Sequence, residues 1–106
     1  EDVTDAFLVA AEKAAEPALA GQVFNLGGSP PTSLTDLANR LIAANGGKGD
    51  YVTKEFPADR APIDIGSYAA DDTAFRNASG WAPRVDLDEG LRRSLAWYRP
   101  RLSDYL

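Results

Sequence analysis

The sequence predicts a small α/β domain in which helices are joined by a few short strands. Apolar residues recur at helical spacing over residues 33–45 and again over residues 86–98, which predicts two amphipathic helices. Short segments of β-branched and aromatic residues lie next to glycine signals, a pattern that is typical of strands. The expected order along the chain is α-β-α-β-loop-β-α-α, with the last strand brief.

The two helices in the first half of the chain have recognisable ends. Residues 3–15 are expected to form the first helix, because their apolar positions fall on one stripe and Pro17 ends the pattern. The second helix is expected over residues 33–45. Ser33 is a candidate N-cap, and Asp36 three residues later completes a capping-box pattern.

Two further helices are expected in the second half of the chain. Asp71 or Asp72 can cap a short helix that ends at Gly80, since glycine commonly follows the last helical residue. The final helix is expected to begin at Asp86, where Glu89 again gives the capping-box spacing. Negative side chains are stabilised by the helix dipole at a helix start. Asp71 and Asp72 are therefore interpreted as a cap and a dipole partner, and not as a catalytic pair of carboxylates.

Three short strands are expected between the helices, at residues 22–26, 51–53 and 67–70. Residues 56–66 contain two prolines, a glycine and three charged residues without periodicity, and are therefore expected to form a loop. With 106 residues, the chain has the size of one small domain or a piece of a larger one.

Composition excludes several kinds of site. The chain has no cysteine, methionine or histidine, which excludes disulfides, thiol nucleophiles, the usual zinc ligands and imidazole bases. Two tryptophans, Trp81 and Trp97, could stack on a nucleotide base, but both are interpreted as buried core residues because packing is their commoner role.

The charge and hydropathy of the chain bear on partners and location. With 11 basic and 16 acidic residues the net charge is −5, so a nucleic-acid partner is not expected. No apolar run reaches the length of a membrane span, so no membrane partner is expected and the expected location is the cytoplasm. Because the first residue is Glu1 and no initiator methionine is present, the chain is expected to be a piece of something longer.

Several segments occur here in the order found in a known family. Five features occur in register: Asp-Val-Thr-Asp-Ala at residues 2–6, Gly-Gln-Val-Phe-Asn-Leu-Gly at 21–27, the Ser33-Leu34 helix start, a short helix ending in Gly80-Trp81, and Leu-Asp-Glu-Gly-Leu-Arg-Arg at 87–93. Together they resemble the extended short-chain dehydrogenase/reductase family, in its NAD(P)-dependent epimerase/dehydratase branch. Ser79 and Ala74 depart from the family pattern, which usually has leucine and lysine, respectively, at these positions.

The resemblance implies an enzyme with two parts. The N-terminal part, of Rossmann type, binds NAD or NADP and carries the catalytic Ser/Thr and Tyr-x-x-x-Lys residues, whereas the smaller C-terminal part closes over a nucleotide-linked sugar. Residues 1–106 would be the C-terminal, substrate-binding region of a nucleotide-sugar epimerase or dehydratase, with the Rossmann half missing. On this interpretation the chain has no catalytic, cofactor-binding or metal-binding residues, is inactive alone, and self-associates through apolar surface left uncovered.

Arg60 and Asp64 are the candidate substrate-binding residues. In the related epimerases, an arginine in this loop contacts the nucleotide diphosphate and an acid shortly after it binds the ribose hydroxyls. A guanidinium forms paired hydrogen bonds with phosphate oxygens, and a carboxylate accepts from adjacent hydroxyls, so the residue types suit this role. The spacing from Asp64 to Asp71 fits the family, whereas Arg60 lies one residue further from Asp64 than in the commonest version. The alternative is a solvated loop in which Arg60 pairs with Asp59.

Three other patterns are interpreted as structural. Tyr51 and Lys54 have the wrong spacing for the catalytic pair of the family, and in a strand they would point to opposite faces. The glycines of residues 46–49 follow a helix, whereas phosphate-binding motifs open one. Residues 27–29 precede a helix and could favour an anion, but the Pro-Pro pair that follows removes two donors and favours a tight turn.

The sequence leaves two other functions open. One is a stand-alone binding or interaction module that has the same fold without the enzyme. The other is a reductase or isomerase of the same superfamily that acts on a substrate other than a nucleotide sugar.

Overall fold

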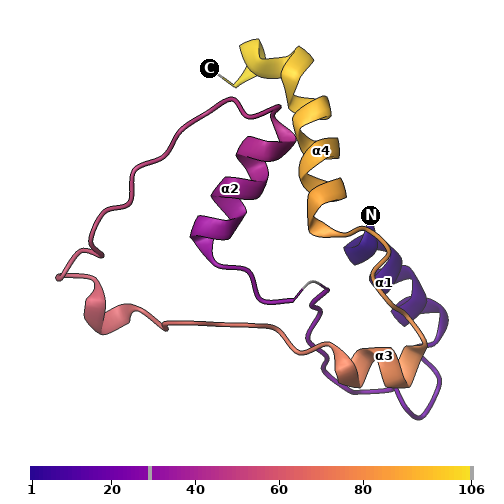
Figure 1. The fold of residues 1–106 in the computed structure, drawn as a ribbon. Helices are drawn as coiled ribbons and strands as arrows, with labels where there is room; N and C mark the ends of the chain where they lie inside the picture. The colour runs from indigo at the N-terminus through magenta and orange to yellow at the C-terminus, as the bar shows by residue number, and fades with distance from the viewer. Residues whose placement is uncertain (29, 106) are drawn as a thin grey trace. The chain divides into compact units, whose positions relative to one another are not determined.

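The computed structural model describes residues 1–28 and 30–105. These residues form the helices α1 (Asp2–Glu12), α2 (Leu34–Ala44), α3 (Thr73–Ser79) and α4 (Leu87–Tyr98), with short 3-10 turns η1 (Ala61–Ile63) and η2 (Arg99–Asp104) (Figure 1). The chain divides into two compact units. Unit 1 contains Glu1–Pro30 and Ala69–Leu87, and unit 2 contains Pro31–Tyr68 and Asp88–Leu106.

Within the described residues no β-strand is present, which corrects the expected α/β class to a helical one. The segments 22–26, 51–53 and 67–70, which were expected to be strands, are irregular or extended without pairing. β-branched and aromatic residues favour a strand only when a second strand binds its backbone N–H and C=O groups. The described chain offers no such partner, and Val23 in the first of these segments is 95% exposed.

The four helices lie where the sequence predicts them, with small differences at their ends. α1 ends at Glu12, earlier than the expected residue 15. α2 confirms the predicted N-cap, because Ser33 Oγ accepts from the Asp36 backbone N–H at 3.0 Å and donates to the Asp36 carboxylate at 2.8 Å. α3 ends at Gly80, whose φ of 73° is the left-handed cap conformation that glycine adopts without strain.

Unit 1 is built around a small aromatic core between α1 and α3 (Figure 1). The ring centroid of Phe75 lies 5.4 Å from that of Phe24 and 5.6 Å from that of Trp81. Such tilted aromatic contacts are favourable beyond the area that they bury. Ala6 on α1 and Leu19 complete the buried apolar set. Because Trp81 is buried within this cluster, its predicted role as a core residue is confirmed.

Asp2 joins the start of α1 to the segment that follows α3. Its carboxylate accepts hydrogen bonds from the backbone N–H groups of Arg84 at 3.1 Å and Val85 at 3.0 Å. These bonds favour the ionised carboxylate and hold the pKa of Asp2 below its ordinary value. The Arg84 guanidinium also pairs with the Asp5 carboxylate, one turn further along α1. The first turn of α1 therefore holds the segment at residues 84–85 in place.

Ser79 closes the turn from α3 into the core. The side chain is buried, and its hydroxyl donates to the Phe75 carbonyl at 2.6 Å and accepts from the Trp81 backbone N–H at 3.1 Å. A leucine, the residue that the resembling family usually has here, could make neither hydrogen bond. The departure from the pattern therefore has a structural role in this chain.

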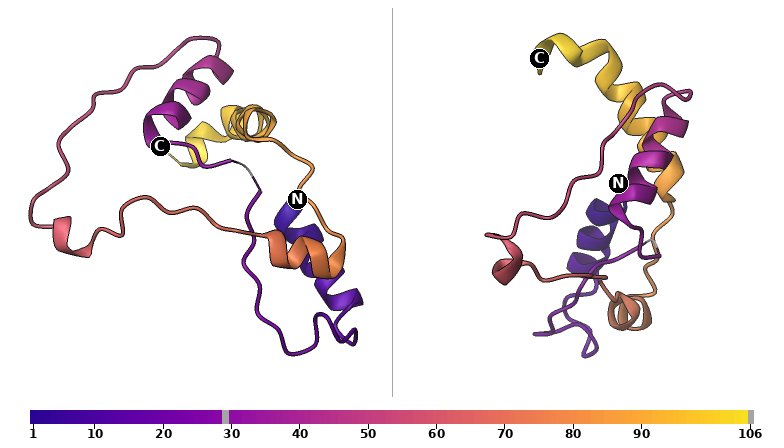
Figure 2. Two further views of the ribbon diagram at one scale, coloured as in Figure 1. Left: turned by 60° about the horizontal axis from the view of Figure 1, so that its bottom comes forward. Right: turned by 60° about the vertical axis from the view of Figure 1, so that its left-hand side comes forward.

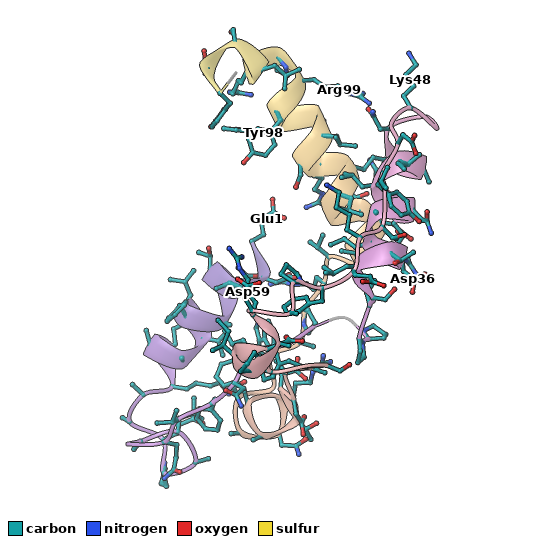
Figure 3. The ribbon with its side chains drawn as sticks, turned by 90° about the vertical axis from the view of Figure 1, so that its left-hand side faces the viewer. Glu1, Asp36, Lys48, Asp59, Tyr98 and Arg99 are labelled. Carbon is teal, nitrogen blue, oxygen red and sulfur yellow. The ribbon has the colours of Figure 1, made fainter. Side chains whose placement is uncertain are left out.

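Unit 2 pairs α2 with α4, which lie side by side in Figures 1 and 2. The Arg40 guanidinium on α2 donates to both carboxylate oxygens of Asp88, at 2.8 Å each. At the other end of α2, Arg99 donates to Asn45 Oδ1 at 2.9 Å, and Figure 3 shows Arg99 extending toward the turn that carries Lys48. Neither helix has a fully buried residue, so this unit has little core of its own.

The end of α4 and η2 carries an exposed aromatic cluster. The rings of Trp97, Tyr98 and Tyr105 contact one another at centroid distances of 4.9, 5.3 and 6.3 Å. The Arg101 guanidinium lies 4.5 Å from the centroid of the Trp97 ring. Trp97 is 47% exposed, so the expectation that it is a buried core residue is wrong.

Candidate functional site

The candidate residues lie on a long loop that leaves the end of α2. Figure 1 shows residues 50–68 running away from α2 and through η1, and all of them are exposed. Two side chains fix the start of this loop. Asn45 Nδ2 donates to the Lys48 carbonyl at 2.9 Å, and the Tyr51 hydroxyl donates to Asn39 Oδ1 at 3.1 Å. The loop is therefore anchored on α2 and open to solvent beyond Tyr51.

Arg60 and Asp64 stand at the two ends of η1. Backbone hydrogen bonds close this turn: the Arg60 N–H donates to the Pro57 carbonyl at 3.0 Å, and the Ile63 N–H donates to the Arg60 carbonyl at 3.1 Å. A proline within η1 restricts its backbone further. The structure thus brings the two predicted residues into one local turn, each with an exposed side chain.

The Arg60 guanidinium forms no hydrogen bond or ion pair within residues 1–28 and 30–105. Of the alternative, the ion pair between Arg60 and Asp59 is not seen in the described residues, whereas the loop is solvent-exposed as that alternative expects. A guanidinium has five N–H donors in a planar fork, and an exposed fork can bind the oxygens of an anion in pairs.

The Asp64 carboxylate is held by the backbone that follows η1. Oδ1 accepts from the Gly66 N–H at 3.2 Å, and Gly66 has a φ of 68°. The second oxygen, Oδ2, has no partner in the part of the chain that the structure describes. A carboxylate with one oxygen held and one open can accept hydrogen bonds from hydroxyl groups.

The two acids before α3 are structural, as their position predicts. Asp71 Oδ1 accepts from the Thr73 N–H at 2.9 Å, and the hydroxyl and backbone of Thr73 hold the pKa of Asp71 below its ordinary value. Asp72 instead accepts two hydrogen bonds of 2.8 Å from Arg76, and this contact raises the pKa of Arg76. Asp71 therefore caps the start of α3, while Asp72 pairs with Arg76, four residues further along the chain.

The glycines of residues 46–49 and 27–28 have structural roles. Gly47 has a φ of 75° and its N–H donates to the Ile42 carbonyl at 2.9 Å, which is a helix stop. Of the turn at residues 27–29, Ser29 lies outside the described residues. Gly27 approaches Ala70 so closely that a Cβ on it would lie 2.7 Å from the Ala70 carbonyl oxygen.

Neither of the two glycine turns in the described residues fits a dinucleotide cofactor. Such a site needs a glycine turn between a strand and a helix start, with space for the pyrophosphate beside the backbone. Here the space at Gly27 is filled by Ala70, and Gly47 closes a helix C-terminus, where carbonyl groups disfavour a phosphate. We therefore assign no chemical step to NAD or NADP within this chain.

Neither a metal cluster nor a membrane-spanning helix is found in the described part of the chain. Residues 1–28 and 30–105 contain no group of three or more acidic side chains that could hold a metal ion. Over the same residues, no helix has the length and hydropathy needed to cross a bilayer.

Sequence reasoning missed a hollow of about 620 Å³ in unit 2, at the start of α2. Ser67 and Tyr68, at the end of the loop, line this hollow together with the residues around the start of α2. The Ser33 hydroxyl already accepts from the Asp36 N–H at the start of α2, and the negative Asp36 carboxylate lies in its first turn, so a bound anion is disfavoured there. The hydroxyl-rich run before α2 is visible in the sequence, but its approach to the end of the loop is not. The lining residues are Pro31, Thr32, Ser33, Leu34, Thr35, Gly66, Ser67 and Tyr68.

No family model matches the chain, and no solved structure matches it at a significant level. Curated relatives do match. The chain is 38% identical over 84 residues to a dTDP-glucose 4,6-dehydratase from Streptomyces griseus, covering 79% of this chain and 25% of the relative. It is 33% identical over 99 residues to a UDP-glucose 4-epimerase from Mycolicibacterium smegmatis, covering 93% of this chain and 29% of the relative.

A more distant relative extends the match over nearly the whole chain. The chain is 28% identical over 108 aligned positions to a dTDP-D-glucose 4,6-dehydratase from Mus musculus, covering 98% of this chain and 29% of the relative. The chain spans about a quarter of the length of the curated relatives that it matches, and it matches their C-terminal part.

Proposed function

We propose that this chain, which belongs to the NAD-dependent epimerase/dehydratase family of extended short-chain dehydrogenases/reductases, forms the part of such an enzyme that contacts a nucleotide-sugar substrate. The relatives are named for reactions of dTDP-glucose and UDP-glucose. Both names contain a nucleoside diphosphate joined to a sugar, so the ligand has two phosphates, a ribose or deoxyribose, and a hexose.

The observation that carries this proposal is the free guanidinium of Arg60 on the same turn as the half-open carboxylate of Asp64. Within the described residues the Arg60 side chain makes no ion pair, so nothing in that part of the chain competes with a diphosphate for it. Asp64 Oδ1 is bonded to Gly66, which leaves Oδ2 for a sugar hydroxyl. In this proposal Arg60 binds the diphosphate and Asp64 binds hydroxyls of the substrate, as the resemblance implies.

An apolar face on unit 1 supports a second part of the proposal. Val3, Phe7 and Leu8 on α1 are 58–69% exposed, beside a small apolar hollow of about 170 Å³. Exposed apolar patches of this kind commonly mark a surface that packs against another protein part. We propose that the cofactor-binding part of the enzyme packs here and supplies the catalytic residues. The hollow is lined by Ala6, Phe7, Ala10, Phe24, Leu26 and Phe75.

Arg60→Ala in the complete enzyme tests the proposed substrate contact. Loss of a charge-assisted contact worth about 1.5–3 kcal/mol should raise KM for the nucleotide sugar roughly ten- to hundredfold. The melting temperature should stay unchanged, because an exposed arginine contributes little to stability. Arg60→Lys should recover part of the loss, since lysine keeps the charge without the two-pronged contact.

Lys54→Ala is the matched control, because Lys54 is an exposed cation on the same loop. It should leave KM unchanged if the effect belongs to Arg60 and not to the general charge of the loop. Asp64→Asn should have a milder effect than Arg60→Ala, because an amide oxygen still accepts one hydrogen bond. An unchanged KM in Arg60→Ala, together with a lower melting temperature, would show that Arg60 is structural and that the proposed site is wrong.

A further inference from the structure

We propose that Gly66 is a positioning residue, which orients the Asp64 carboxylate for ligand binding through its left-handed backbone. The inference rests on the proposed function, because it concerns the carboxylate assigned there to the substrate hydroxyls. It concerns a different residue, however, and one that would not itself touch the ligand.

The geometry between the two residues is local and complete. Asp64 closes η1 with φ −75° and ψ 125°, so the chain becomes extended there and turns back at Gly66. The Gly66 N–H then points at the Asp64 side chain and donates to Oδ1 at 3.2 Å. This hydrogen bond restrains rotation of the carboxylate, because an exposed aspartate without such a bond samples several rotamers.

The backbone of Gly66 is what allows this hydrogen bond. Its φ of 68° lies in the left-handed region, which costs an ordinary L-residue about 1–2 kcal/mol. A Cβ placed on Gly66 would meet no heavy atom within 4 Å, so the site has room for a side chain. Glycine is therefore required here for its conformation and not for space.

An alanine at this position would act through the turn alone. To relieve its left-handed strain, the backbone at residue 66 would rotate and carry its N–H away from Asp64 Oδ1. The carboxylate would lose its restraint while its charge and its place in the sequence stayed the same. Ligand affinity should fall, because the side chain must then be ordered when the ligand binds.

Gly47 provides a matched control for the strain itself. It also lies in unit 2, it has a φ of 75°, and a Cβ on it would likewise meet no heavy atom within 4 Å. Gly47→Ala and Gly66→Ala thus impose the same backbone strain at two places. A change in ligand binding that occurs only in Gly66→Ala therefore belongs to the position and not to the strain.

The experiment is a calorimetric titration of UDP and of dTDP into the complete enzyme. Gly66→Ala should raise Kd about five- to thirtyfold. This is the factor by which the cost of the left-handed conformation, about 1–2 kcal/mol, lowers the population of the turn that holds Asp64. Gly47→Ala should leave Kd unchanged. Gly66→Asn should recover most of the affinity, because asparagine adopts the left-handed region more readily than other non-glycine residues.

A double-mutant cycle with Asp64→Ala decides whether Gly66 acts through Asp64. In the Asp64→Ala background, Gly66→Ala should have no further effect on Kd. If Asp64→Ala leaves Kd unchanged, the proposed ligand contact at Asp64 is wrong. If Asp64→Ala weakens binding but Gly66→Ala behaves like Gly47→Ala, or Gly66→Asn binds as weakly as Gly66→Ala, the inference about Gly66 is overturned while the contact at Asp64 stands.

Discussion

Ser79→Ala should destabilise unit 1 more than its small change in size implies. The variant removes a buried hydroxyl that forms two hydrogen bonds, to the Phe75 carbonyl at 2.6 Å and from the Trp81 N–H at 3.1 Å. Alanine fills almost the same volume, so no cavity term enters. The backbone N–H of Trp81, however, is left without its acceptor at a buried position.

The magnitude follows from these two bonds. Each contributes about 0.5–1.5 kcal/mol net, and an orphaned buried N–H costs at the upper end of that range or above it. The better helix propensity of alanine offsets at most about 0.5 kcal/mol. The expected loss of unfolding free energy is therefore about 1–2.5 kcal/mol, which lowers Tm by roughly 5–15 °C in a domain of this size.

Urea unfolding followed by tryptophan fluorescence measures this loss. A Trp97→Phe background leaves Trp81, the buried tryptophan of unit 1, as the reporter. Ser94→Ala is the control, because Ser94 is an exposed serine within α4 and its replacement should be neutral or slightly stabilising. Equal midpoints for Ser79→Ala and Ser94→Ala would refute the argument that the Ser79 hydroxyl supports the turn into the core.

Three further outcomes are expected of the 106-residue chain. Calorimetric titration of NAD and of NADP should show no micromolar binding, because neither glycine turn of the described residues has the geometry that a dinucleotide needs; a micromolar Kd for either would contradict this. In sedimentation at high micromolar concentration the chain should self-associate through the apolar face of α1, and Phe7→Glu should shift it toward monomer; a strictly monomeric parent chain would count against this use of the face. Because the pKa of Asp2 is lowered in the folded state, its stabilisation is complete above the unfolded pKa and is lost as pH falls below about 4. Asp2→Asn should therefore lose less stability than the parent chain between about pH 4 and pH 2 in an acid titration followed by circular dichroism, and identical acid profiles would show that the carboxylate is not coupled to folding.

The features that the sequence predicted correctly depend on neighbours along the chain. The N-cap of α2 needs only Ser33 and Asp36, and the end of α3 needs only a glycine that can adopt a positive φ. The family could likewise be identified from short segments in register. Arg60 and Asp64 came from that resemblance, and the structure adds that they share one turn, while their contact with substrate stays a prediction.

The predictions that failed concern partners that no local pattern can specify. Residues 22–26 have the composition of a strand, but a strand forms only when another pairs with it, and the described residues supply none. Trp97 has a large aromatic side chain of the kind usually buried in a core, yet at the end of α4 it is half exposed. Ser79 stood out in the sequence only as a departure from a pattern, because its two hydrogen bonds exist only once the turn beyond α3 is formed.

By itself, the sequence determined the four helices, the N-cap of α2, the glycine end of α3 and the family, since these depend on residues within a few positions of one another or on the order of short segments. Only the tertiary structure decided that Arg40 binds Asp88 and that Asp2 binds the backbone at residues 84–85, because these groups are far apart along the chain. It also decided that Gly66 holds Asp64. The spacing of two residues permits that bond, but the left-handed φ that directs the N–H toward the carboxylate depends on how the whole loop turns.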